Sequence, residues 1–167
     1  MSDNPPPCGV IFDLDGTLAD TLDDLADCLN TALVDLGFSR VEPDRLRWMI
    51  GDGLPALLQR AAATDDPARL ERLLEHYRAI YRHGMLNRTK LFAGIAGMLD
   101  RLAERAVPMT VLSNKSHEFT VQMCDSLLAR WTFRRFQGMT DEAWKKPEPA
   151  AALELARMME RPPAQVY

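Results

Sequence analysis

The chain has 167 residues, of which 47% are hydrophobic, and a formal net charge of -4. This length suits one domain, or one core with a modest insertion, and the hydrophobic share argues against a disordered chain. The mild acidity argues against a nucleic-acid partner, and no segment approaches the roughly 18 apolar residues that a membrane helix needs. We therefore expect a globular, cytoplasmic protein with neither a nucleic-acid nor a membrane partner.

Cysteine usage and the first residues favour the same compartment. Cys8, Cys28 and Cys124 lie far apart, and no CxxC or Cys/His spacing indicates a zinc site. We interpret them as small core residues of a protein in a reducing environment. Residues 1–7 are polar and proline-rich, which does not fit a secretion signal.

The first elements in chain order are a buried strand and three helices. Residues 8–12 (CGVIF) form a short apolar run that meets a charge and then Gly16, a pattern typical of a strand covered on both faces. The first helix has Asp20 or Thr21 as its cap and Gly37 as its stop. The three helices are predicted over residues 22–36, from about residue 55, and over residues 70–81.

Strands and helices alternate after residue 91. In order, the patterns predict a helix over 95–102, a strand over 108–112, a helix over 116–130, a weak strand or loop over 133–139, a helix around 153–159 and the start of a strand at 165–167. This order indicates an α/β protein with a mainly parallel sheet. The helical stretch 20–89 is too long for one crossover, so we interpret it as a cap domain inserted into a core made of 1–19 and 90–167.

Two carboxylates follow the first strand at a spacing that suits phosphate chemistry. Asp13 and Asp15 are two residues apart, and Gly16 lets the chain turn sharply, so both side chains can reach one cavity. Such charges repel, and Mg²⁺ relieves the repulsion while it binds phosphate oxygens. One carboxylate can attack phosphorus, and the other can protonate the leaving alkoxide and later deprotonate water. The alternative is an acidic turn that only caps the next helix.

Three segments together resemble the motifs of the haloacid-dehalogenase-like phosphatases. FDLDGTLAD (12–20) is similar to the first motif, VLSNK (111–115) to the second and WKKPEP (144–149) to the third. The resemblance implies Asp13 as nucleophile, Asp15 as general acid and base, and Mg²⁺ bound at both residues. It also implies a phosphate-binding set of Thr17, Ser113, Asn114 and Lys146, with Lys145 as the alternative lysine.

Within that family the chain resembles the phosphoglycolate-phosphatase-like branch. RWMIGDGLPALLQRA (47–61) is similar to the helix–Gly-x-Gly–helix signature of the branch, and LSNKSHEFT (112–120) is similar to its second motif region. The resemblance implies a Rossmann-like core and a mobile helical cap. The implied substrate-facing turn is Gly51, Asp52 and Gly53, and Arg60 is either a carboxylate binder or part of a solvated helix face.

The carboxylate at Asp15 selects among the reactions of the family. Because only an alkoxide leaving group needs a proton, Asp15 favours a phosphate ester over a haloacid, and 2-phosphoglycolate is the best guess. A pyrophosphatase, a nucleotidase and a sugar phosphomutase remain alternatives, since the core chemistry is shared and selectivity lies in the cap. The oligomeric state stays open.

The sequence departs from the family at its fourth motif. No GD-x-x-x-D follows the third motif, and Gly51-Asp52 in the cap is the only Gly-Asp pair. We expect either a fragment of a longer protein or a naturally shortened one, with the core incomplete beside the strand that leads to Asp13. Mg²⁺ would then be held by Asp13 and the backbone carbonyl of Asp15 alone, so this chain should be weakly active or inactive. A non-catalytic remnant that acts as a binding partner is the alternative.

Overall fold

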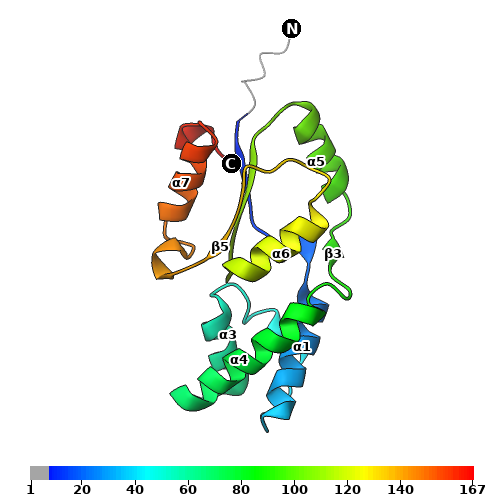
Figure 1. The fold of residues 1–167 in the computed structure, drawn as a ribbon, viewed down its shortest axis with the longest axis vertical. Coiled ribbons are helices and arrows are strands. Elements are labelled where there is room, and N and C mark those ends of the chain that lie inside the picture. The colour runs from blue at the N-terminus through cyan, green and yellow to red at the C-terminus, as the bar shows by residue number, and fades with distance from the viewer. Residues whose placement is uncertain (1–7) are drawn as a thin grey trace.

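The structure is a computed structural model, and it describes residues 8–167. The polar segment predicted for residues 1–7 lies outside the described residues. Figure 1 shows an α/β part that holds the main sheet, with a separate group of helices at one end of it. The site lies where these two parts meet.

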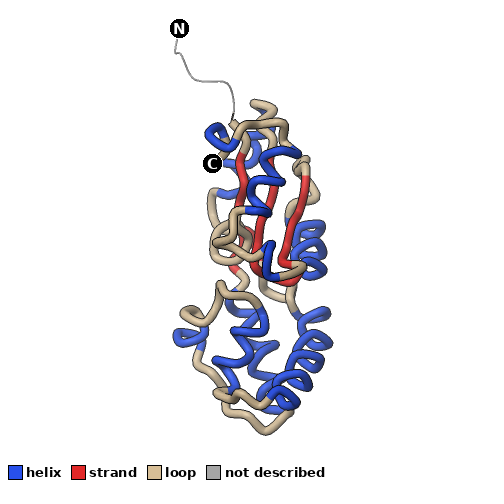
Figure 2. The backbone as a smooth tube through the Cα atoms, turned by 90° about the vertical axis from the view of Figure 1, so that its left-hand side faces the viewer, coloured by secondary structure: helices blue, strands red, loops and turns tan. Residues whose placement is uncertain are grey.

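Three parallel strands form the main sheet, which is drawn in red in the upper half of Figure 2. They are β1 (Val10–Phe12), β4 (Met109–Ser116) and β5 (Arg135–Met139), with β4 in the centre. Because parallel strands end at the same edge, the residues that follow β1 and those at the end of β4 are close in space. The predicted α/β fold with a parallel sheet is confirmed, and β5 is a complete strand where the sequence indicates only a weak strand or loop.

Helices cover both faces of this sheet (Figure 1). The covering helices are α5 (Ile95–Glu104), α6 (His117–Leu127) and α7 (Ala150–Met158). Leu112 of β4 packs with Leu155 of α7, whereas its neighbour Val111 belongs to the main core together with Phe119 of α6. Successive side chains of a strand point to opposite faces, so the continuous apolar run of β4 serves both layers.

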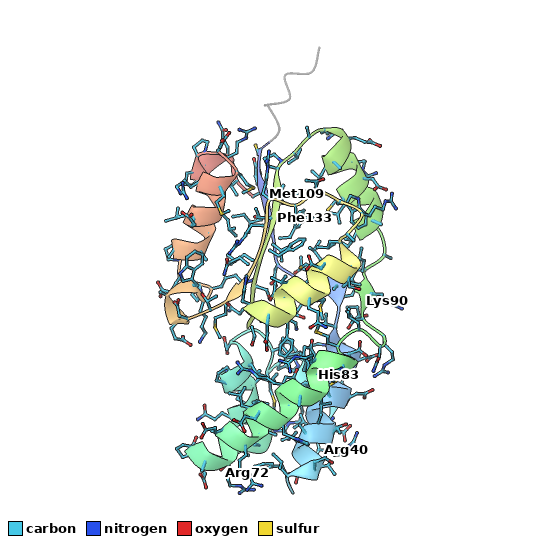
Figure 3. The ribbon with its side chains drawn as sticks, viewed as in Figure 1. Arg40, Arg72, His83, Lys90, Met109 and Phe133 are labelled. Carbon is cyan, nitrogen blue, oxygen red and sulfur yellow. The ribbon has the colours of Figure 1, made fainter. Side chains whose placement is uncertain are left out.

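Four helices form the group at the carboxyl edge of the sheet. They are α1 (Leu22–Asp35), α2 (Pro43–Leu46), α3 (Leu54–Ala62) and α4 (Pro67–Gly84). Their interior is made of leucines such as Leu29, Leu58 and Leu73, which are almost completely buried. In Figure 3, Arg40 and Arg72 lie at the end of this group that is far from the sheet. Within residues 8–167, no helix combines the length and the apolar character that a bilayer crossing requires.

A short antiparallel ribbon joins the two parts. It consists of β2 (Ala19–Asp20) and β3 (Lys90–Leu91), with Ala19 opposite Leu91. The ribbon includes Asp20 and begins its second strand at Lys90, so it lies next to the bounds predicted for the inserted cap, which stay a prediction. Asp24 of α1 is 2% exposed and accepts hydrogen bonds from the backbone N–H groups of Arg88 and Thr89, at 2.9 and 2.8 Å, so the cap helix is tied to the strand that returns to the core.

The last residues lie beside β1, on the side opposite β4. After the 3-10 turn η2 (Pro163–Gln165), Val166 forms a parallel bridge with Gly9, and the N–H of Ile11 donates to the carbonyl of Tyr167 at 2.8 Å. The pairing agrees with the predicted start of a strand at 165–167, and it places that segment next to the strand that leads to Asp13.

Two local predictions differ from the structure in detail. Thr21, one of the two predicted caps, occupies the N-cap position of α1, but its hydroxyl makes no capping hydrogen bond and donates to the carboxylate of Asp15. The helix predicted over residues 116–130 is shorter and ends at Leu127, since the chain turns there to reach β5.

Candidate active site

A tight loop directly after β1 carries the two carboxylates. The carbonyl of Leu14 accepts hydrogen bonds from the N–H groups of Leu18 and Ala19 at 3.1 and 3.0 Å, and Gly16 has a φ of +78°, which an L-residue rarely adopts. Asp13 and Asp15 line the same cavity, of about 90 Å³, at the carboxyl edge of the sheet. The glycine turn therefore brings both side chains to one place.

Lys146 lies against Asp13. Its ammonium donates to Oδ1 of Asp13 at 2.7 Å and to the carbonyl of Leu112 at 3.0 Å. Lys145 instead pairs with Glu142 at 3.2 Å, in the 3-10 turn η1 (Glu142–Trp144), and does not line the cavity. Of the two candidate lysines, Lys146 is thus the one that neutralises charge at Asp13.

The end of β4 is irregular, and the four consecutive residues 113–116 line the cavity. Leu112 pairs with Gln137 and Ser116 with Met139, so β4 holds two more residues than β5 between these contacts. Such a bulge redirects side chains. Ser113, Asn114 and Lys115 all line the cavity as a result, and Ser113 is only 2% exposed.

Asn114 links the second motif to the third motif and to the cap. Its amide nitrogen donates to the carbonyls of Gly51 at 2.7 Å and Lys146 at 3.1 Å, and its amide oxygen accepts from the N–H of Lys146 at 2.7 Å. Gly51 and Gly53 line the cavity, and a Cβ on Gly53 would lie 3.5 Å from the carbonyl of Asn114. The two predicted cap glycines therefore sit against the core.

Three predicted residues lie away from this cavity. Thr17 is exposed and lines neither this cavity nor the adjoining one. Asp52 is exposed and forms an ion pair with Arg60, which also donates to the carbonyl of Met49 at 3.2 Å. The side chains of Asp52 and Arg60 thus stabilise the cap turn itself.

Lys115 was missed by sequence reasoning. Its ammonium donates to Oδ1 of Asp15 at 2.9 Å, and the hydroxyl of Thr21 donates to the same oxygen at 2.7 Å. The side chains of Lys115 and Asp15 are only 8% and 14% exposed. The sole hint in the sequence is the position of Lys115 directly after Ser113-Asn114, since its partner is far away along the chain.

The cap closes the cavity with apolar and aromatic side chains. Tyr77 and Tyr81 of α4 stack at 5.1 Å between ring centroids, and both line the cavity together with Leu25 and Leu57. Burial raises the pKa of both tyrosines well above the usual value, so both hydroxyls stay protonated. Both tyrosines lie within the helix predicted over residues 70–81, and in the structure they form part of the cavity wall.

The acidic pair fits a magnesium ion in part. Asp13 and Asp15 also line a second cavity of about 550 Å³, which adjoins the first and includes Asp20 and Arg47. Within residues 8–167, no group of three His, Cys, Asp or Glu side chains has the arrangement of a complete metal site. Mg²⁺ accepts one or two carboxylates with water and phosphate oxygens as its other ligands, and Asp13, whose side chain is 42% exposed, can supply such a ligand.

Comparisons with known proteins place this arrangement in a family. A family model described as haloacid dehalogenase-like hydrolase matches residues 10–167. The chain is 32% identical over 164 residues to the phosphoglycolate phosphatase of Pseudomonas syringae pv. syringae, covering 93% of this chain and 59% of that protein. It is 31% identical over 154 residues to the phosphoglycolate phosphatase of Aquifex aeolicus, covering 92% and 71%.

A solved structure has the same fold. A protein described as a predicted phosphoglycolate phosphatase from Haemophilus somnus superposes with a TM-score of 0.89 at 24% identity, over 97% of this chain and 76% of that one. The chain spans 59% of the length of the Pseudomonas relative. By sequence and by fold, the chain belongs to the haloacid dehalogenase-like hydrolase family, in its phosphoglycolate-phosphatase-like branch.

Proposed function

We propose that the protein is a Mg²⁺-dependent phosphatase that hydrolyses a small phosphate monoester through a phosphorylated Asp13. The observation that carries the proposal is the contact of Lys146 with Asp13 at 2.7 Å, in a cavity that Asp15 and Ser113 also line. This set pairs a nucleophile with a cation, a hydroxyl donor and a second carboxylate. A cytoplasmic location belongs to the same proposal, because Cys28 and Cys124 are buried thiols.

The first half-reaction makes the aspartyl phosphate. Both hydrogen bonds to the Asp13 carboxylate, from Lys146 and from the N–H of Leu14, go to Oδ1, and Oδ2 accepts none from residues 8–167. Oδ2 attacks phosphorus while the bond from phosphorus to the leaving oxygen breaks, and Asp15 gives its proton to that oxygen. The Ser113 hydroxyl and the Lys146 ammonium stabilise the charge on the transferring group.

The second half-reaction restores the carboxylate. Asp15, now without its proton, accepts one from a water molecule whose oxygen bonds to phosphorus, and the bond from phosphorus to Asp13 breaks. Inorganic phosphate leaves, and both carboxylates return to their starting states. Magnesium, when bound at the acidic pair, screens the phosphate from Asp13 and orients it.

The proposed substrate is small, with 2-phosphoglycolate as the first choice. Leucines and tyrosines of the cap line the cavity of about 90 Å³, and the adjoining cavity of about 550 Å³ at the same carboxylates gives a small phosphate ester room to bind. Two relatives in this branch are named phosphoglycolate phosphatase. We also propose that the cap, residues 20–89, acts as a lid that opens for substrate entry.

The test measures phosphate release by the purified product of the complete reading frame, with Mg²⁺. Asp13→Asn should lower kcat by at least about 1,000-fold, since the attacking oxygen is lost. Asp44→Asn, at an exposed position of α2, serves as the matched control and should retain full activity. Full activity of Asp13→Asn would rule out the nucleophile.

A substrate panel separates the related activities. It contains 2-phosphoglycolate, pyrophosphate, a nucleoside monophosphate and a hexose 1-phosphate, each assayed for released phosphate and for isomerised product. Preference for 2-phosphoglycolate supports the proposal, whereas conversion of the sugar phosphate without phosphate release would identify a mutase and overturn it.

A further inference from the structure

We propose that Lys115 is a positioning residue that, together with Thr21, holds the Asp15 carboxylate in place for proton transfer to the leaving group. This inference rests on the proposed function, because it concerns the proton donor of that reaction. It adds to the reaction a buried cation that makes no contact with Asp13.

The hydrogen bonds of Asp15 point to this role. Lys115 and Thr21 donate to the same oxygen, Oδ1, at 2.9 and 2.7 Å. The other oxygen, Oδ2, accepts no hydrogen bond from the described part of the chain and remains available to the substrate. The two donors come from the end of β4 and the start of α1, so the carboxylate is held from two separate elements.

The surroundings of Lys115 keep its ammonium in position. The nitrogen lies 5.0 Å from the ring centroid of Tyr81, a contact that attracts a cation to the ring face. Tyr81 itself stacks on Tyr77 and makes an edge contact with Phe119 of α6, each at 5.1 Å between centroids. Because Tyr81 belongs to the cap and Lys115 to the core, this contact joins the two parts of the molecule.

The two lysines of the cavity have different partners, which separates their roles. Lys146 contacts Asp13, where phosphorus is attacked, and Lys115 contacts Asp15, where the leaving oxygen takes a proton. During the transfer a proton moves from Oδ2 of Asp15 to the leaving oxygen as the bond from that oxygen to phosphorus breaks. Lys115 keeps its own protons and donates its hydrogen bond throughout.

The test uses two substrates that differ in their need for a proton donor. A primary alkyl phosphate expels a strongly basic alkoxide, whereas p-nitrophenyl phosphate expels a stable phenolate that needs no proton. Because Asp15 also serves the second half-reaction, which both substrates share, the quantity compared is the rate of leaving-group release in the first turnover. Lys115→Met should lower this rate by about 100-fold for the alkyl phosphate, because a misplaced catalytic group costs about that much, and should change it by less than about 3-fold for p-nitrophenyl phosphate.

Two further variants complete the comparison. Thr21→Val removes the other donor and should show the same selective loss to a smaller degree, which keeps the test decisive if Lys115→Met does not fold. Lys145→Met removes a lysine that pairs with Glu142 outside the cavity, and both rates should stay unchanged. Equal losses on the two substrates in Lys115→Met or Thr21→Val would overturn the positioning role.

A second readout does not depend on activity. In urea unfolding, Lys115→Met should lower the midpoint because a buried carboxylate loses its partner, and adding Asp15→Asn should recover part of that loss. Additive effects of the two substitutions would refute the coupling. If the wild-type protein hydrolyses no phosphate ester, the proposed function fails, and the unfolding cycle still decides whether Lys115 holds Asp15.

Discussion

Gly53 is a residue of the cap turn that packs against the ends of β4 and β5. Its φ is +85° and its ψ 167°, and a Cβ there would lie 3.2 Å from Cε of Met139. This region of the backbone is essentially reserved for glycine. Gly53→Ala should therefore reduce the unfolding free energy by about 1–3 kcal/mol. It should also raise KM, because the turn would no longer fit against Asn114.

Gly97 supplies the matched control for that experiment. It is exposed in α5, and no atom lies within 4 Å of a Cβ built at this position. Gly97→Ala should raise the unfolding free energy by up to about 1 kcal/mol, since alanine is the better helix former. Urea unfolding of both variants measures the difference, and an equal effect at the two positions would contradict the argument from backbone strain.

Residues next to a strand end could be predicted from the sequence, and residues held by distant partners could not. Asp13, Ser113 and Lys146 follow short apolar runs or a recognisable motif, so their position in the chain indicates their place in the fold. Lys115 acquires its role from Asp15, which is 100 residues away. No local pattern reports such a contact, because it depends on the register of β4 against β1 and on the bulge at the end of β4.

Asp24 connects two elements at the border between the cap and the core. Its carboxylate accepts hydrogen bonds from the N–H groups of Arg88 and Thr89, and the side chain is almost fully buried. Asp24→Ala would leave both N–H groups without an acceptor. The unfolding free energy should fall by about 2–3 kcal/mol.

Asp23, the neighbouring residue of α1, is the control for this prediction. Its side chain is 67% exposed, and it pairs with the guanidinium of Arg88 at 3.4 Å. Asp23→Ala should change the unfolding free energy by less than about 1 kcal/mol, as is usual for exposed ion pairs. A loss as large as that of Asp24→Ala would mean that the ion pairs with Arg88, and not the hydrogen bonds from the backbone N–H groups, hold β3 in place.

Element length decided which parts of the fold could be predicted. The helices α1 and α4 are long enough for several turns of apolar periodicity, and both were predicted. The ribbon strands β2 and β3 have two residues each, so no period can show in them. They form because the segment that leaves the α/β part and the segment that returns to it lie side by side, and this neighbourhood depends on the whole fold.

The stability of the whole molecule should decrease at alkaline pH. Burial, with nearby carboxylates, raises the pKa of Cys28 to about 11 and that of Cys124 to about 12, from an ordinary value of 9.0. Both thiols lose their protons more readily in the unfolded chain, so their contribution to stability is complete below pH 9 and is lost as the pH rises toward 11 and 12. The buried Tyr77 and Tyr81 act in the same direction.

Urea unfolding between pH 8 and pH 11 measures this effect. The unfolding free energy should stay level near pH 8 and decline above about pH 9, the ordinary pKa of a thiol. Cys124→Ala should make the decline shallower, because one of the groups that release protons on unfolding is gone. The same slope in the variant and the wild type would exclude Cys124 as a source of the pH dependence.

The antiparallel ribbon bears on how the inserted helical segment can be replaced. Ala19 and Leu91 are paired neighbours, so the 20–89 segment leaves the α/β part and re-enters it at nearly the same point. Because the two ends of this segment are adjacent, another segment with adjacent ends can replace it without disturbing the sheet. We therefore propose that the helical unit can be exchanged for another while the loop that carries Asp13 is kept, which would alter the choice of leaving group.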